Sequence, residues 1–216
     1  MINKKKVRLH IKKNNEFFQY KYVKRILDFI FALLATISLF SIVFIIISII
    51  ILITNRYRPL FKQQRTGHKG ISFYIYKFRT MSNNSEHKIE EIIGKGTNGF
   101  LQIENDCRVT KVGRFLRKTS IDELPQLINI LKGEMSFIGP RPLVYEDVKK
   151  LSGKHLQRYY AKPGITGYAQ VNGRSIASLA KREINDLYYI DNISFSLDTK
   201  IFFKTIIVLF KKDMVF

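Results

Sequence analysis

An apolar run from Phe29 to Ile53 restricts the fold of this chain more than any other feature of its sequence. The run holds no charged residue over about twenty-five positions, and roughly twenty apolar residues are enough for a helix to cross the hydrocarbon core of a bilayer. Asp28 stands just before it, where a carboxylate is expected to face interface cations such as Lys24 or Arg25 and not lipid. The simplest prediction is a membrane-spanning helix.

Basic residues flank both ends of this run, which complicates a simple crossing. They are Lys24 and Arg25 before it and Arg56, Arg58 and Lys62 after it. Because Lys and Arg favour the cytoplasmic side of a membrane, neither end of the run is favoured to lie outside. A helix that enters the membrane and returns on the same face would satisfy both ends.

The chain is also strongly basic as a whole. Its 216 residues include 37 Lys and Arg against 17 Asp and Glu, a formal net charge of +20, which indicates an anionic partner such as phospholipid, nucleotide phosphate or nucleic acid. Residues 1–22 form a basic tail, which we expect to be a solvated arm attracted to anionic headgroups. The single cysteine, Cys107, rules out an internal disulfide, and the four histidines show no metal-ligand spacing.

The stretch from Gly113 to Leu143 combines an acidic pair, several cations and a helical pattern. Apolar residues recur there at helical spacing, at Leu124, Leu127, Ile128 and Leu131. This spacing predicts an amphipathic helix from Glu123 to Lys132, with Gly133 as its C-cap.

Two interpretations of the start of this helix remain open. Ser120 and Glu123 fit a capping box, which would give the acidic pair a purely structural role. Pro125 disfavours that interpretation, because it would fall beyond the first turn and remove an internal hydrogen bond. With Asp122 as the N-cap, Pro125 lies in the first turn, and free backbone N–H groups there can hold a phosphate.

The acidic pair, Asp122 and Glu123, follows a group of cations at Arg114, Arg117 and Lys118. A carboxylate kept ionised by a helix N-terminus and nearby cations is a candidate nucleophile toward phosphorus. Arg141 lies between two prolines, which favour an extended backbone from which a guanidinium can grip a phosphate. The alternative for Arg141 is a surface turn with an incidental arginine.

Residues 60–64 and 71–78 have the pattern of two strands, and the turn at 66–70 joins them as a predicted β-hairpin. In the second strand Lys77 and Arg79 fall on the same face. Such charges usually belong to a solvated edge strand, so the spacing alone gives Lys77 no chemical role.

The remaining segments are less distinctive. The polar, glycine-rich segment from Ser82 to Asn105 predicts a surface loop, and Val144–Lys162 has a helical pattern. Closely spaced Pro-Gly, Thr-Gly and Asn-Gly pairs in Lys162–Arg174 indicate successive turns around a short strand.

Two further helices are expected near the C-terminus. One covers Lys181–Tyr189, and the other runs from about Thr199 to Lys212 with Asp198 as its cap. The second has a basic stripe and an apolar face, a combination that suits the bilayer interface. It is equally compatible with a core helix of a soluble domain.

Three ordered segments carry a resemblance to a known family: YKFRTM (Tyr76–Met81), RVTKVGRFLRKTSIDELPQLINILKGEMSFIGPRPL (Arg108–Leu143) and KPGITGYAQVNGR (Lys162–Arg174). They resemble the bacterial sugar transferase family of monotopic polyprenyl-phosphate phosphoglycosyl transferases. The resemblance runs from about residue 24 to residue 216. Tyr168 stands where many members carry Trp, which keeps an aromatic face.

The resemblance implies an α+β, mainly helical fold: a monotopic membrane protein with a β-hairpin and a small helical catalytic domain with interfacial helices. A re-entrant helix would cover 23–56, and the catalytic domain 57–216. Family members break this helix at a Ser-Pro pair, but residues 40–42 read Phe-Ser-Ile here. Ser38 and Ser41 would have to bend it by bonding back to carbonyls of the preceding turn. The expected location is the bacterial inner membrane, with the catalytic domain facing the cytoplasm.

The resemblance also implies a reaction: transfer of a sugar 1-phosphate from a UDP-sugar to polyprenyl (undecaprenyl) phosphate, with release of UMP, at the start of exopolysaccharide, capsule or O-antigen synthesis. Asp122 would carry a covalent phosphosugar, and Glu123 would bind Mg²⁺. Phosphate would be bound by Lys77, Arg117, Arg141 and Arg174. Nucleotide would be bound by Gln170 and Asn172.

A membrane-tethered basic module that binds an anionic partner is the alternative function. The charge supports it, but no nucleic-acid-binding motif is recognisable, and nucleic acid is therefore not an expected partner. The sequence does not reveal which sugar is transferred, which glycan pathway uses it, or whether the chain forms a homodimer.

Overall fold

The computed structural model describes residues 15–55, 57–82, 106–151, 153–172 and 179–210. The basic tail as far as residue 14 and the predicted loop over 83–105 lie outside this part of the chain. The described residues form a mainly helical fold with two two-stranded sheets, which confirms the predicted mainly helical α+β class.

The long apolar run is part of two helices that meet at a bend. Helix α1 (Asn15–Ala35) passes through a π-helical turn over 36–40 into α2 (Ser41–Asn55). The hydroxyl of Ser38 donates to the Leu34 carbonyl (2.8 Å), and that of Ser41 donates to the Thr36 carbonyl (2.7 Å). The predicted serine back-bonds are therefore present, and such bonds bend helices.

Among the described residues, no single helix combines the length and the apolar composition that crossing a membrane requires. The segments Tyr20–Ser38 and Ser41–Thr54 meet that requirement only as a pair, with a bend of 59° between them.

The predicted hairpin is confirmed. Strands β1 (Leu60–Thr66) and β2 (Ser72–Phe78) are antiparallel, and the 3-10 turn η2 (His68–Gly70) joins them. Gly70 has a φ of 74°, a left-handed conformation that glycine adopts without strain.

Only the C-terminal part of the helix predicted over Glu123–Lys132 is an α-helix. Residues Ile121–Gln126 form a 3-10 helix, η4, and the α-helix α5 covers only Leu127–Lys132. Both predicted starts are wrong: Asp122 lies inside η4, and Ser120 precedes it in a left-handed conformation without a side-chain cap. Gly133, with a φ of 79°, ends α5 as predicted.

A second sheet follows α5. Strand β3 (Ser136–Ile138) pairs in parallel with β4 (Gly164–Thr166), so a short strand does lie among the predicted turns, followed by helix α7 (Tyr168–Val171). The strands are close because Gly164 allows it: a Cβ there would stand 2.1 Å from the Gly139 nitrogen.

The helix predicted over Val144–Lys162 is divided into two. Helix α6 covers Tyr145–Lys150, and the 3-10 helix η5 covers Gly153–Tyr160. Leu151 ends α6 with an extended backbone (ψ 138°), which is incompatible with a continuous helix.

The last two helices are longer than predicted. Helix α8 covers Leu179–Asp191 and α9 covers Phe195–Phe210. Asp198 is not the cap of α9. It lies in the first turn of that helix, and the hydroxyl of Ser194 accepts from the backbone N–H of Leu197 instead (3.3 Å).

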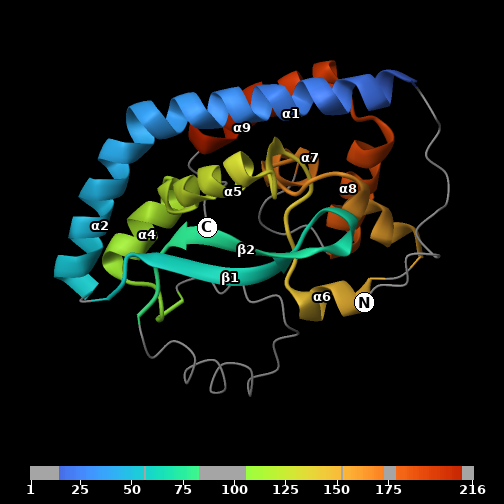
Figure 1. Cartoon of the computed structure of the whole chain (residues 1–216). Coiled ribbons are helices and arrows are strands. Elements are labelled where there is room, and N and C mark those ends of the chain that lie inside the picture. The colour runs from blue at the N-terminus through green and yellow to red at the C-terminus, as the bar shows by residue number, and fades with distance from the viewer. Residues whose placement is uncertain (1–14, 56, 83–105, 152, 173–178, 211–216) are drawn as a thin grey trace.

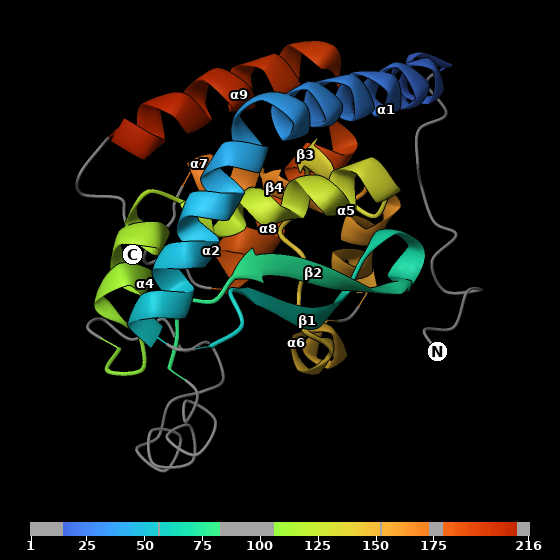
Figure 2. The same cartoon turned by 60° about the vertical axis from the view of Figure 1, so that its left-hand side comes forward.

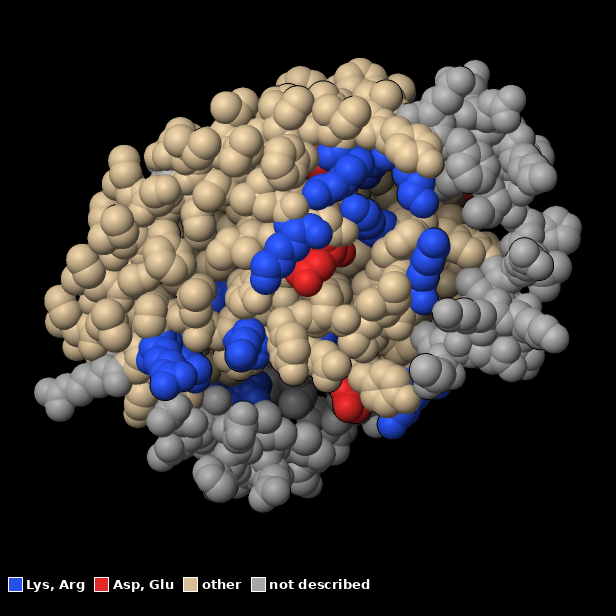
Figure 3. Space-filling view, viewed as in Figure 1, with Lys and Arg blue, Asp and Glu red and all other residues tan. Residues whose placement is uncertain are grey.

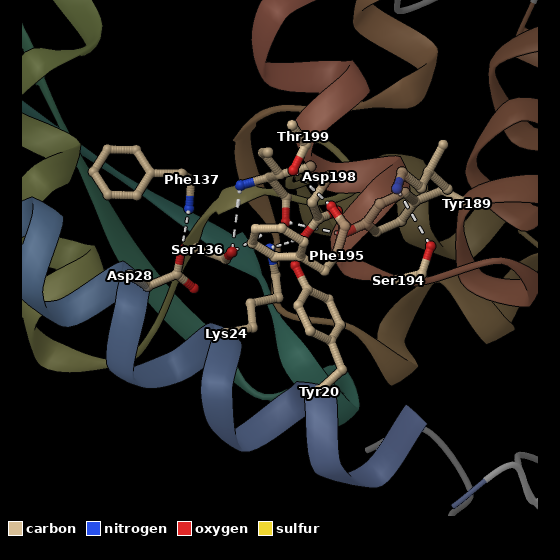
Figure 4. Close-up of polar contacts among 12 residues, drawn as sticks. Tyr20, Lys24, Asp28, Ser136, Phe137, Tyr189, Ser194, Phe195, Asp198 and Thr199 are labelled. Atoms are coloured by element: carbon tan, nitrogen blue, oxygen red, sulfur yellow. Dashed lines mark hydrogen bonds and ion pairs between the residues drawn. The ribbon is translucent and has the colours of Figure 1, made fainter. Parts of the chain in front are cut away.

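Asp198 is the centre of a buried polar cluster that ties α1 to α8 and α9 (Figure 4). Its carboxylate accepts hydrogen bonds from Tyr20 (2.6 Å), Lys24 (2.5 Å) and Tyr189 (2.8 Å). Asp28, one turn further along α1, is buried and accepts from the backbone N–H of Phe137 (3.2 Å). Its hydrogen-bond partners are the Phe137 backbone and the Ser136 side chain, while Lys24, one of the two predicted cations, acts on it through its charge.

Helices α1 and α9 lie side by side along one side of the molecule, with α2 turning away at one end and the hairpin below (Figures 1 and 2). The hairpin packs through Phe73 and Ile75 into a core that α1 and α5 complete. The outer faces of the three long helices are apolar and exposed: Phe29, Phe31 and Leu34 on α1, Ile42, Ile45, Ile49 and Ile53 on α2, and Phe202, Phe203 and Ile207 on α9.

Candidate active site

Glu123 lies at a point where three separate segments meet. Its Oε1 atom accepts from Lys77 Nζ on β2 at 2.7 Å and from Arg141 Nη2, in the loop after β3, at 3.0 Å. The structure thus brings together three of the predicted site residues that are far apart in the sequence. The capping role considered for Glu123 is not observed, because its side chain is engaged with these two cations.

The electrostatics of this cluster keep Glu123 ionised. Burial alone would raise the pKa of Glu123, but the charges of Lys77 and Arg141 outweigh that effect and hold this pKa well below its usual range. The Glu123 charge in turn raises the pKa of Arg141. Burial lowers the pKa of Lys77 despite the neighbouring carboxylate.

Asp122 has a different environment from its neighbour. Its side chain is buried, with 8 % of the residue exposed, and none of the hydrogen bonds or ion pairs found among the described residues reaches its carboxylate. Burial raises the pKa of Asp122, and the Glu123 charge adds to this, whereas Lys77 and Arg117 act to lower it. Asp122 is therefore a buried carboxylate with cations nearby but no bonded partner.

Arg117 is placed beside this pair from helix α4 (Lys111–Lys118). Its Nε donates to the hydroxyl of Thr80 (3.0 Å), and its charge acts on Asp122 without a direct bond. Helix α4 can pack closely against the backbone at Thr80 because residue 113 is glycine. A Cβ at this position would lie 2.1 Å from the Thr80 carbonyl oxygen.

A buried asparagine fixes the hairpin against α5. The side chain of Asn129 accepts from the Tyr76 backbone N–H (3.1 Å) and donates to the Tyr74 carbonyl (2.7 Å). Tyr76 precedes Lys77 in β2, and Asn129 follows η4, which carries Glu123. The two hydrogen bonds of Asn129 therefore help to place Lys77 opposite Glu123. The sequence analysis did not single out Asn129.

Sequence reasoning also missed two arginines around Arg141. Arg158 on η5 donates to the Arg141 carbonyl (2.7 Å) and pairs with Asp186 on α8 (2.9 Å). Arg65 on β1 donates to the carbonyl of Pro142 (3.3 Å). Little in the sequence indicated either arginine. Each contacts a backbone carbonyl in residues 139–142 (GPRP), and such a contact cannot be predicted from a local sequence pattern.

The predicted nucleotide-binding residues are not part of this cluster. Gln170 donates to the Ile165 carbonyl (2.8 Å), and the side-chain oxygen of Asn172 accepts from Lys204 on α9. Arg174 lies outside the described residues. The predicted nucleotide-binding role of these residues remains a prediction.

The acidic pair is chemically compatible with a Mg²⁺ site. Mg²⁺ in phosphate-transfer sites takes one or two carboxylates and completes its shell with substrate phosphates and water. Both cations on Glu123 use Oε1, which leaves Oε2, together with the Asp122 carboxylate, as oxygen donors. No group of three or more acidic, His or Cys ligands occurs among the described residues, so substrate oxygens would have to supply the rest.

The Lys and Arg side chains around this buried carboxylate are donors of the kind that bind phosphate groups in proteins. The chain as a whole belongs to the bacterial sugar transferase family, which it matches over residues 19–212. This result confirms the resemblance found in the three sequence segments.

Several relatives define what the chain is similar to. It is 46% identical over 146 residues to the uncharacterized sugar transferase EpsL of Bacillus subtilis, covering 68% of this chain and 67% of that protein. It is 38% identical over 189 residues to the exopolysaccharide production protein ExoY of Rhizobium meliloti, covering 85% and 83%. It is 36% identical over 201 residues to the UDP-galactose-lipid carrier transferase of Erwinia amylovora, covering 89% of this chain but only 42% of that protein.

Proposed function

We propose that this protein transfers a sugar 1-phosphate from a UDP-sugar to polyprenyl (undecaprenyl) phosphate and releases UMP. The observation that carries the proposal is the Asp122 carboxylate, which is buried beside Lys77, Arg117 and Arg141 without a bonded partner. Relatives that are named as lipid-carrier or undecaprenyl-phosphate sugar transferases support the substrate class.

In the first step, an Asp122 oxygen attacks the phosphorus that bears the sugar. A bond forms between that oxygen and phosphorus, the phosphoanhydride bond breaks, and its bridging oxygen leaves with UMP. Lys77 and Arg141 offset the negative charge that develops on the phosphoryl oxygens. Asp122 suits this role better than Glu123, because no hydrogen bond has to be broken to free its carboxylate.

In the second step, a phosphate oxygen of polyprenyl phosphate attacks the same phosphorus. The bond to Asp122 breaks, the carboxylate is regenerated, and the sugar is left on a polyprenyl diphosphate. Glu123 would hold Mg²⁺, which would supply neutralisation of the negative charge on the diphosphate. The two-step route predicts ping-pong kinetics.

The proposed place of the protein is the inner membrane, with the site facing the cytoplasm, and the exposed apolar faces support the contact with a membrane. The bent pair α1–α2 suits a re-entrant segment that enters and leaves on one side, and the exposed aromatic face of α9 suits the interface. At this position the polyprenyl substrate would reach the acidic pair by diffusion within the membrane.

The decisive experiment uses purified full-length protein, UDP-sugar labelled in the sugar and Mg²⁺, without any lipid acceptor. We expect a labelled protein adduct and release of UMP in no more than a stoichiometric amount. Asp122→Asn should abolish the adduct and reduce turnover at least about a thousandfold. Asp191→Asn, an exposed carboxylate on α8, is the matched control and should behave as wild type.

A panel of UDP-sugars in the same assay would identify the donor. Relatives are named for galactose, glucose and N-acetylgalactosamine, so these three are the first donors to compare. A protein that forms no adduct with any donor, yet still binds membranes, would reject the reaction in favour of a binding module.

A further inference from the structure

A group of basic side chains gathers beneath α1, at the far end of α5 from the acidic pair. We call the following residues the basic cluster: Lys21 and Arg25 on α1, Lys69 in the hairpin turn, and Lys162 before β4. Figure 3 shows Lys and Arg side chains collected on this face between α1 and the hairpin, with a smaller acidic patch beside them. Arg25 and Lys162 meet beside Gly133. A Cβ atom built on this glycine would lie 3.2 Å from Arg25 Nη2 and 3.4 Å from Lys162 Nζ.

Arg25 is the member of the basic cluster whose guanidinium is hydrogen-bonded to described residues. Arg25 donates to the carbonyls of Ile130 (2.6 Å) and Leu131 (2.9 Å), at the negative end of α5. Among the described residues, no carboxylate lies within ion-pair distance of Lys21, Lys69 or Lys162.

The neighbouring groups respond to this excess of positive charge. His68, beside Lys69, has its pKa lowered to about 4, first by burial and then by Lys21 and Lys69. Burial and then the charge of Arg25 lower the pKa of Lys162, although Asp28 acts in the opposite direction. Holding like charges together costs free energy, and a bound anion would remove that cost.

The position of the basic cluster indicates which anion would reach it. Lys21 lies on α1 next to the exposed apolar residues Tyr22, Val23 and Ile26, which is where the headgroups of a bilayer would meet this helix. The hairpin separates the cluster from the acidic pair: β2 alone extends about 17 Å between Ser72 and Lys77 at roughly 3.3 Å per residue. A phosphate held in the cluster would therefore be too far from Asp122 to react.

We propose that the basic cluster binds the phosphate of an anionic membrane phospholipid, which is a structural partner and not a substrate. This inference rests on the proposed function, in that it places α1 at the membrane surface. The bound headgroup would fix the height of the hairpin turn above the bilayer. Because the hairpin also carries Lys77, the lipid would help to set the depth of the site.

The test compares two lipids around the full chain in nanodiscs. Electron paramagnetic resonance of spin-labelled phosphatidylglycerol and spin-labelled phosphatidylcholine gives their relative association with the protein. We expect wild type to prefer phosphatidylglycerol about tenfold or more. The double variant Lys69→Gln/Lys162→Gln should lose most of that preference, since each basic residue near a membrane surface contributes about fivefold.

Two controls separate this effect from charge in general and from misfolding. Lys111→Gln/Lys154→Gln removes the same charge from exposed positions on α4 and η5 and should keep the preference. Lys69→Arg/Lys162→Arg preserves the charge and should also keep it.

An unchanged preference in Lys69→Gln/Lys162→Gln would overturn the proposal. So would a lower kcat/KM for polyprenyl phosphate with an unchanged preference, because the basic cluster would then serve the acceptor. The lipid measurement needs no turnover, so a failure of the proposed reaction, seen as a missing Asp122 adduct, is distinguishable from a failure of this inference.

Discussion

Two of the buried carboxylate centres in this protein differ in how completely their hydrogen-bonding capacity is satisfied. At the α1–α9 junction, Asp198 receives three hydrogen bonds, from Tyr20, Lys24 and Tyr189. At the candidate active site, Glu123 receives two cations on one oxygen, while Asp122 beside it receives no hydrogen bond among the described residues.

The difference is consistent with the proposed function, in which the Asp198 centre is structural and the Asp122 centre reacts. A buried charge without hydrogen bonds destabilises a fold, so a protein that forms a fully bonded carboxylate elsewhere could have satisfied this one too. A largely buried carboxylate that lies next to cations without a hydrogen bond to them is an arrangement that active sites use to bind and react with charged substrates. The Asp198 centre joins helices, and the Asp122 centre is where the proposed reaction would take place.

The largest expected effect on stability is at the structural centre. Asp198→Asn should lower the free energy of unfolding by about 3 kcal/mol, because Lys24 loses its counter-charge and the hydrogen bonds weaken. Thermal unfolding in detergent measures this change, with Asp191→Asn as the exposed control. Turnover per folded molecule should stay within about threefold of wild type; a thousandfold loss would show that the two centres are not separate.

An intermediate effect is expected for Glu123→Gln, since it leaves Lys77 and Arg141 without a full counter-charge. We expect a loss of about 2 kcal/mol, less than for Asp198 because Arg141 is partly exposed to water. The folded-state pKa of Glu123 is lowered, so its stabilising effect is complete at neutral pH and declines as the pH falls below about 4.3.

The melting temperatures of wild type and Glu123→Gln should therefore converge as the solution is acidified. Glu146→Gln, an exposed position on α6, controls for a general change in charge. If the difference in melting temperature between wild type and Glu123→Gln stays constant from pH 7 to pH 3, Glu123 does not stabilise the fold through its ionised form.

The sequence predicted the parts of this arrangement that depend on local pattern. The hairpin, the glycine end of α5 and the serine back-bonds at the bend all follow from residue preferences within a few positions. The family resemblance placed Lys77 among the phosphate-binding residues, and the structure brings it into contact with Glu123. No local pattern joins residues 77, 123 and 141.

The failures have physical causes as well. Ser120 adopts a positive φ of 58°, which starts a 3-10 helix where both interpretations expected an α-helical cap. Asp198 fitted a cap pattern, but its partners Tyr20 and Lys24 lie more than 170 positions away. Long-range tertiary contacts determined the role of the Asp198 side chain, and such contacts cannot be predicted from the residues next to it in the sequence.

The smallest expected effect gives the sharpest test of the comparison. Asp122→Asn should stabilise the fold by about 1 kcal/mol at pH 7.5, because it removes a buried charge that has no bonded partner. The folded-state pKa of Asp122 is raised, so the wild-type group favours folding fully below the ordinary Asp pKa of about 3.9 and loses that contribution as the pH rises through the folded-state value. The melting temperature of Asp122→Asn should exceed that of wild type at pH 7.5 and approach it at pH 3.5. A variant that is inactive and also less stable at pH 7.5 would show that Asp122 is a satisfied structural residue like Asp198, and the distinction between the two centres would be lost.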